Sequence, residues 1–114
     1  MIARTWRGSA TIANADAYEH HFTTNVVPHL QVLEGHKGAF LLRRERDGQI
    51  DFVAVTLWDS IETIRRFAGP DAEKANVEPR ARAILSGFDE IASNYQVVHD
   101  SGFGLLGAAP VIIA

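Results

Sequence analysis

The histidines are the side chains of this sequence that most readily suggest chemistry. The chain has 114 residues, five histidines and no cysteine, and His20 and His21 are adjacent in the stretch AYEHHFTT. Successive residues of a helix point about 100° apart, whereas two-histidine metal sites on one helix use positions i and i+4. The fourth position after His21 is Asn25. We therefore predict no metal site here, with His20 in solvent and His21 at the flank of the apolar face of its helix.

A third histidine, His29, directly follows Pro28 and is predicted to lie near the centre of that apolar face. Proline has no amide hydrogen, so the carbonyl of Thr24 loses its usual helical donor. A histidine that faces a cavity beside such a break can act as a general base near neutral pH. The alternative is a partly buried histidine whose ring is hydrogen-bonded to a backbone carbonyl. His29 is thus the first candidate for a catalytic base, and His21 is the second.

The element that must position these histidines is an amphipathic helix predicted over residues 15–33. Asn14 is a suitable N-cap for it, and Pro28 is expected to kink or split it near residues 25–27. Apolar side chains recur at steps of three and four residues, which is the spacing of one helix face. These side chains are Tyr18, Phe22, Val26, Leu30 and Leu33.

Strand patterns lie on both sides of this helix. The opening stretch MIARTWRGS alternates so that Ile2, Arg4 and Trp6 share one face. Further along, AFLLRRER and QIDFVAVTLW flank Asp47-Gly48, and this dipeptide favours the type I′ turn of a β-hairpin. The second hairpin strand is apolar on both faces, which predicts a sheet that is covered on both sides.

The rest of the chain is predicted to supply a second helix, short helical segments and a last strand. Asp59 to Glu62 is a capping pattern with Asp59 in the cap role, and Gly69-Pro70 ends the helix that follows. DAEKANV and residues 79–86 are predicted as short helices, and SNYQVVHD as the last strand. This order predicts an α+β, ferredoxin-like split βαβ fold with a four-stranded antiparallel sheet and helices on one face. The uncovered apolar face predicts a homodimer joined through the two sheets.

Composition limits the possible partners. The formal net charge is −3, and no basic stripe is present to bind nucleic acid. No stretch has the length and apolar character of a transmembrane helix or a signal peptide, so a cytoplasmic location without a membrane partner is expected. Residues 1–100 are predicted to form one domain. The apolar tail, residues 101–114, is predicted either to pack on the partner subunit or the sheet edge, or to be disordered.

Four stretches together resemble a known family. MIARTWRG, HKGAFLLRR, FVAVTLWDSIETIRRFAG and FDEIASNYQVV are similar to segments of the antibiotic biosynthesis monooxygenase domain family, within the dimeric α+β barrel superfamily. The resemblance covers about residues 1 to 99. It implies a dimeric barrel with a pocket between the helices and the sheet of each subunit. It further implies a cofactor-independent monooxygenase, with no cofactor, that acts on a small aromatic or quinol-type molecule.

The resemblance also implies roles for particular residues. Trp58 stands where the family commonly has a tryptophan at the end of the third strand, and Trp6 is a second candidate; the alternative for both is core packing. The oxygenases of the family pair their tryptophan with an asparagine on the sheet, whereas this strand carries Ala54 and Thr56. The haem-degrading branch needs a histidine after the second helix, and residues 67–79 contain none. Haem degradation is therefore disfavoured.

A set of aromatic and basic side chains is expected to bind the substrate. Arg65 is placed at the pocket mouth to hold an anionic oxygen, the alternative being a solvated charge beside Glu62. The aromatic members of the set are Trp6, Phe22, Phe52 and Phe67. The competing hypothesis is a non-catalytic dimeric barrel that binds a small apolar ligand. A space between helices and sheet that side chains fill completely would favour the non-catalytic reading.

Overall fold

The computed structural model describes residues 1–104, so the part of the predicted tail from 105 to 114 lies outside the described residues. No helix in the described part of the chain is both long and apolar enough to cross a membrane. The elements follow one another in the order β1 (Ile2–Thr11), α1 (Ile12–His21), the π-helix η1 (Phe22–Val26), α2 (Val27–Gln31), β2 (His36–Arg46), β3 (Gln49–Trp58), α3 (Ile61–Ala68), α4 (Pro79–Ile84), β4 (Gly87–Phe88) and β5 (Ser93–Gln96).

The strands form one antiparallel sheet with β1 in the interior. The order is β2-β3-β1-β4, and β5 also pairs with β1. Strand β4 pairs with Gly8 and Ser9, and β5 pairs with residues 2–5, so these two short strands occupy the fourth position of the sheet in succession. The predicted four-stranded ferredoxin-like arrangement is confirmed, with its last strand divided in two. At the β2–β3 hairpin both Asp47 and Gly48 have positive φ, as a type I′ turn requires.

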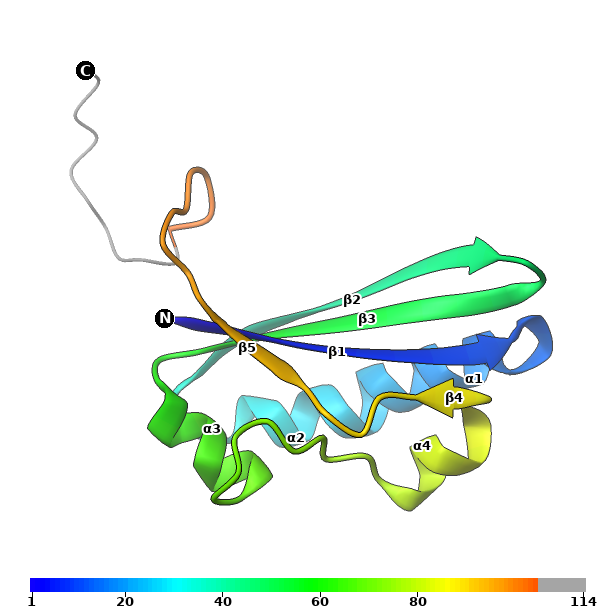
Figure 1. Ribbon diagram of the computed structural model, residues 1–114, viewed down its shortest axis with the longest axis horizontal. Coiled ribbons are helices and arrows are strands. Elements are labelled where there is room, and N and C mark those ends of the chain that lie inside the picture. Colours follow the sequence, from blue (N-terminus) through cyan, green and yellow to red (C-terminus); the bar gives the residue numbers. More distant parts are fainter. Residues whose placement is uncertain (105–114) are drawn as a thin grey trace.

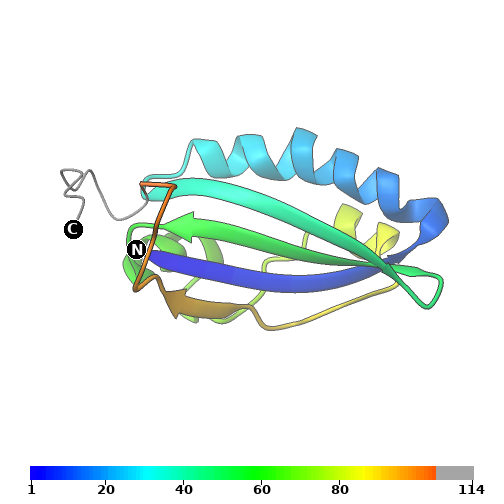
Figure 2. The same ribbon diagram turned by 90° about the horizontal axis from the view of Figure 1, so that it is seen from above.

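The helices all lie on one face of the sheet, and the core lies between them and the sheet (Figure 1). Seen from above, α1 and α2 run along the sheet on the β2 side, and α4 lies close to α1 at the same end of the sheet (Figure 2). Two buried clusters fill this layer. One contains Tyr18, Phe52 and Leu85, and the other contains Leu30, Trp58 and Ile64. This face carries the alternate residues of β1 and β3 that the sequence pattern placed inward.

The first helix differs from its prediction in two respects. Its N-cap is Thr11, whose hydroxyl accepts from the amide of Asn14, so the prediction of Asn14 as the cap was wrong. The chain also passes Pro28 without a break, because one turn widens into the π-helix η1, in which the amide of Val27 donates to the carbonyl of Phe22. A π-turn lengthens the hydrogen-bonded ring by one residue, and this change stands where the sequence predicted a kink.

Two segments in the middle of the chain also differ from their predictions. Helix α3 is capped by Ser60, which exchanges side-chain and backbone hydrogen bonds with Thr63, whereas Asp59 was predicted in that role. DAEKANV is not a helix but a turn followed by extended chain, with one isolated bridge between Lys74 and Ile91. The carbonyls that a helix would have used internally are thereby left available to side chains of the sheet.

The second face of the sheet carries exposed apolar side chains. Phe40, Leu42 and Tyr95 are 46%, 53% and 59% exposed, and they alternate with inward residues on β2 and β5. After β5 the chain rises over this face (Figure 1), where the ring of Phe103 meets that of Phe40 edge-on at 6.4 Å. The prediction of two apolar faces is confirmed for β3, while the dimer that it suggested remains a prediction.

Candidate active site

A cavity of about 90 Å³ lies between the helices and the sheet. Its walls include members of both buried clusters, so the cavity separates the two parts of the core. The lining residues come from β1, α1, η1, α2, β3, α3, α4, the loop before α4 and the segment between β4 and β5. The lining residues are Arg4, Trp6, Tyr18, His21, Phe22, Val26, His29, Leu30, Ala54, Thr56, Phe67, Ala75, Asn76, Val77, Glu78, Ala81 and Ala92.

His21 is the buried histidine of this cavity. It is 2% exposed, because the turn that ends α1 directs its ring toward Tyr18, at 6.2 Å between ring centroids. Its Nδ1 lies 3.2 Å from the side-chain amide nitrogen of Asn25, four residues further along the helix. Its Nε2 is buried without a hydrogen-bond partner in the structure, and the carboxylate of Glu78 lies 4.0 Å away.

These contacts fit a proton acceptor. An asparagine amide presents a donor and an acceptor that can exchange places by turning the group. Turned so that its oxygen accepts from Nδ1–H of His21, the Asn25 amide leaves a lone pair on Nε2. A proton received there creates an imidazolium next to the Glu78 carboxylate, which stabilises the new charge.

The other two histidines of the first helix are exposed. His20 lies in solvent as predicted. His29 is also exposed, so its predicted place near the centre of the apolar face was wrong: the extra residue of the π-turn rotates the helix after it relative to the segment before. His29 still lines the cavity, with its ring 6.4 Å from the ring of Phe67.

A buried cation forms a second polar feature of the cavity. Arg4 is 5% exposed and donates to the main-chain carbonyls of Ala72 and Lys74, in the segment that is not helical. Its guanidinium also lies 5.9 Å from the centre of the Phe67 ring. Burial lowers the pKa of Arg4, and the nearby Asp71 opposes that shift. An arginine nonetheless stays protonated at neutral pH.

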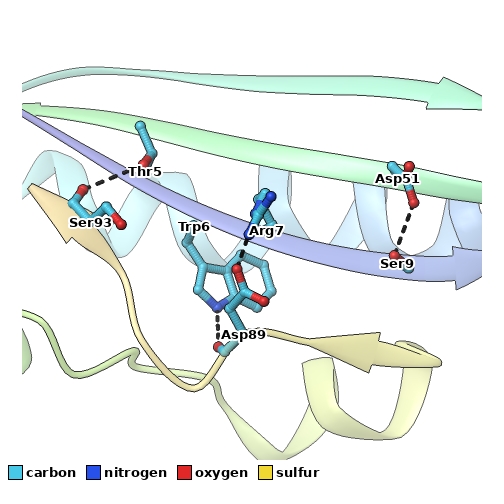
Figure 3. Close-up of polar contacts among 7 residues, drawn as sticks. All are labelled: Thr5, Trp6, Arg7, Ser9, Asp51, Asp89 and Ser93. Atoms are coloured by element: carbon cyan, nitrogen blue, oxygen red, sulfur yellow. Dashed lines mark hydrogen bonds and ion pairs between the residues drawn. The ribbon is translucent and has the colours of Figure 1, made fainter.

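Aromatic rings connect the two polar features. Trp6 follows Arg4 on the inward face of β1, and its ring lies 6.3 Å from that of Tyr18. Its indole nitrogen donates to the carbonyl of Asp89 at 2.7 Å, which fixes the ring against the segment between β4 and β5 (Figure 3). Burial raises the pKa of Tyr18 above its usual range, so the phenol stays protonated.

The structure brings some of the predicted site residues together and leaves others apart. His21, His29, Trp6, Phe22 and Phe67 line the cavity. Trp58 does not. It is fully buried, donates to the hydroxyl of Thr56 at 2.8 Å and stacks on Phe67 at 5.5 Å.

Two predicted substrate-binding residues also lie elsewhere. Phe52 is fully buried in the other core cluster, 4.8 Å from the ring of Tyr18, and is absent from the cavity wall. Arg65 is exposed on α3 and pairs with Glu62 at 2.6 Å, which is the alternative that the sequence left open. The expected role of Arg65 at the pocket mouth has no geometric support.

Sequence reasoning missed Arg4, Tyr18 and Glu78 as site residues. Arg4 had a readable signal, because an arginine between Ile2 and Trp6 on an inward strand face must be buried with partners. Tyr18 was assigned to the apolar stripe, and its ring belongs there. Glu78 carries no signal, since only the fold brings it to His21.

No group of three or more histidine, aspartate or glutamate side chains within residues 1–104 is arranged to hold a metal ion.

No protein-family model matches the sequence, and no curated protein sequence matches it. Solved structures do match the fold. A candidate antibiotic biosynthesis monooxygenase from Bacillus cereus has a TM-score of 0.65 and 15% identity over 90% of this chain and 95% of its own. The chain has the fold of the antibiotic biosynthesis monooxygenases.

Two further solved structures share this fold with different described activities. SnoaB, a cofactor-independent oxygenase from Streptomyces nogalater, has a TM-score of 0.58 and 18% identity over 89% of this chain and 95% of its own. The heme-degrader MhuD from Mycobacterium tuberculosis, described with two hemes in its active site, has a TM-score of 0.58 and 20% identity over 90% of this chain and 100% of its own. Because one monooxygenase fold carries both activities, the activity of this chain has to be argued from its own cavity.

Proposed function

We propose that this protein is a cofactor-independent monooxygenase of a small aromatic or quinol-type molecule, working as a cytoplasmic homodimer. The observation that carries the proposal is the buried His21, whose Nε2 has no hydrogen-bond partner and lies beside Glu78 at the wall of the cavity. The volume of about 90 Å³ favours a single ring over a polycyclic substrate. The fold shared with SnoaB supports the reaction class.

The reaction begins with proton transfer. His21 Nε2 takes the proton of a phenolic hydroxyl, and Glu78 stabilises the imidazolium that results. The phenolate, held among the aromatic and aliphatic side chains of the cavity wall, passes one electron from its ring to O₂. Superoxide and the ring radical combine to form a carbon–oxygen bond at a ring carbon that bears hydrogen.

The second half of the reaction balances the atoms. The proton of the ring carbon passes to the outer peroxide oxygen, the oxygen–oxygen bond breaks with loss of hydroxide, and a new carbonyl remains on the ring. The leaving hydroxide takes the proton from His21 and becomes water. For a simple phenol the sum is phenol plus O₂ giving quinone plus water: the ring loses four electrons, one oxygen atom enters the product, and the other leaves as water.

Two predicted residues keep roles within this proposal. Trp58 stacks behind Phe67 and holds that ring as part of the cavity wall, acting as a positioning residue. His29 is exposed at the cavity and forms part of the wall that faces solvent. The competing function is ligand binding without turnover. Two observations favour it: Trp58 lies outside the cavity, and its partners on the neighbouring strands are Ile2 and His36, with no asparagine beside it.

Oxygen uptake tests the proposal. The purified protein is assayed with an oxygen electrode against hydroquinone, catechol and 1-naphthol, and the product formed under ¹⁸O₂ is analysed by mass spectrometry. Uptake with a single-ring substrate and incorporation of one labelled oxygen are expected. His21→Gln should lower kcat by about 10²-fold to 10⁴-fold, the usual contribution of a general base.

His20→Gln is the matched control, because it makes the same change at the neighbouring exposed position and should leave kcat unchanged. The proposal is wrong if none of the three compounds is consumed above the buffer rate. It is equally wrong if His21→Gln turns over as fast as His20→Gln.

A further inference from the structure

The charge of Arg4 is the feature of the cavity that proton abstraction does not use. Arg4 is 5% exposed, and no carboxylate in the described part of the chain forms an ion pair with it. Its two hydrogen bonds go to carbonyl oxygens, those of Ala72 and Lys74. Buried charges in proteins are normally paired, because an uncompensated one is strongly destabilising.

The donors of Arg4 are only partly used. A guanidinium carries five N–H groups in a rigid fork, and two main-chain carbonyls accept from its two terminal nitrogens. The same fork matches a carboxylate in geometry and charge. Asp71 is near enough to act on the charge of Arg4, but it forms no direct ion pair with it. Since Arg4 lines the cavity, a carboxylate on the ligand would supply that direct ion pair.

The position of Arg4 relative to His21 sets the shape of that ligand. Arg4 and Trp6 are two residues apart on one face of β1, which is about 7 Å along a strand. Trp6 contacts Tyr18, and Tyr18 contacts His21, so the two polar features stand at separate places joined by aromatic rings. Glu78, beside His21, repels a carboxylate at that end and so favours the Arg4 end for it.

We propose that the cavity binds a single aromatic ring carrying an ionised carboxylate, that Arg4 receives this carboxylate, and that the ring hydroxyl lies toward His21. The ligand class is therefore a hydroxybenzoate, an anionic phenol. The flat walls of Trp6 and Phe67 accept the ring. This inference rests on the proposed function for the direction of the hydroxyl, while the carboxylate site stands on Arg4 alone.

Binding without oxygen tests the site separately from turnover. Isothermal titration calorimetry under anaerobic conditions compares 4-hydroxybenzoate with 4-hydroxybenzamide, its neutral counterpart of similar size. The intact protein should bind the carboxylate at least about tenfold more tightly, as expected for a charge-assisted contact. Arg4→Gln should abolish that preference and leave the affinity for the amide within about twofold of its original value.

Asn94→Ala is the matched control for the loop. Asn94 donates to the carbonyl of Ala72 at 2.9 Å, the oxygen that Arg4 also uses, but it is absent from the cavity wall. Loss of this bond should leave the preference for the carboxylate intact. If the preference disappears in Asn94→Ala as it does in Arg4→Gln, loop position explains the effect and the proposed contact is wrong.

If Arg4→Gln does not fold, the affinities of the intact protein for the acid and the amide still test the carboxylate site. Equal affinity for the acid and the amide would overturn the carboxylate site, even if the protein consumes oxygen with another phenol. Conversely, tight carboxylate binding with no oxygen uptake would support the Arg4 site and contradict the proposed monooxygenase. The two proposals therefore fail in different measurements.

Discussion

His36 places a titratable group where its charged form is costly. Its ring meets Trp58 edge-on at 5.3 Å, and its Nε2 is buried with no hydrogen-bond partner in the structure. Burial lowers the pKa of His36, and a hydrogen bond involving the backbone of Gly38 opposes the shift only in part. The folded protein therefore binds this proton less readily than the unfolded chain.

The acid dependence of stability follows from that shift. Above about pH 6.5, His36 is neutral in both the folded and the unfolded state, so its protonation does not lower the free energy of unfolding. As the pH falls below that value, the unfolded chain takes up the proton first, so the free energy of unfolding declines until the pH reaches the lowered pKa. His36→Gln should flatten this decline, measured by urea unfolding at several pH values. His20→Gln should retain it, and equal slopes for the two variants would contradict the assignment.

Single residues also show how far the candidate site could be predicted. The sequence identified the correct helix and both of its cavity histidines, because apolar periodicity fixes which face turns inward. It ranked His29 above His21, because ideal helix geometry was extended through the turn before Pro28. The π-turn rotates the residues after it around the helix axis. The local sequence does not distinguish a helix that kinks before a proline from one that widens by a turn.

At the scale of elements, the start of α3 offers a direct comparison between two neighbouring residues. The hydroxyl of Ser60 accepts from the amide of Thr63, and the hydroxyl of Thr63 accepts from the amide of Ser60. Asp59 is exposed and pairs with Lys37 at 3.5 Å, which contributes little at a surface. Ser60→Ala should lower the free energy of unfolding by about 1 kcal/mol.

Asp59→Ala should change the free energy of unfolding by less than about 0.5 kcal/mol, because it removes only a surface carboxylate. Chemical denaturation of both variants at neutral pH measures the difference. A larger loss in Asp59→Ala than in Ser60→Ala would show that Asp59 caps the helix, as the sequence pattern first suggested.

The order of the elements could be predicted because each element depends on a local sequence pattern. The contacts that complete the cavity join residues far apart in the sequence and could not be predicted in this way. The Asp47-Gly48 turn and the alternation of β3 were each visible in a few residues. DAEKANV was misassigned as a helix because its composition favours one, while Arg4, some 70 positions away in the chain, binds its carbonyls in extended form. Long-range hydrogen bonds of this kind override local propensity.

At the scale of the whole molecule, the open face of the sheet is the surface on which a dimer is predicted. The helices cover one face only (Figure 1). On the other face Phe40 and Leu42 are 46% and 53% exposed on β2, next to the valines of β3. A continuous apolar surface of this kind marks an interaction site, and a second copy of the same face is self-complementary. We therefore expect a homodimer joined through the sheets.

The prediction is tested by placing a charge on that face. Phe40→Glu should convert the dimer into a monomer in sedimentation velocity at micromolar concentration, because burying an unpaired carboxylate in the interface costs more than the apolar contact gains. Val32→Glu is the control. Val32 is 78% exposed, beyond the end of α2 and away from the sheet, so this variant should remain a dimer. A wild-type protein that sediments as a monomer would contradict the assembly and would leave the apolar face without its expected cover.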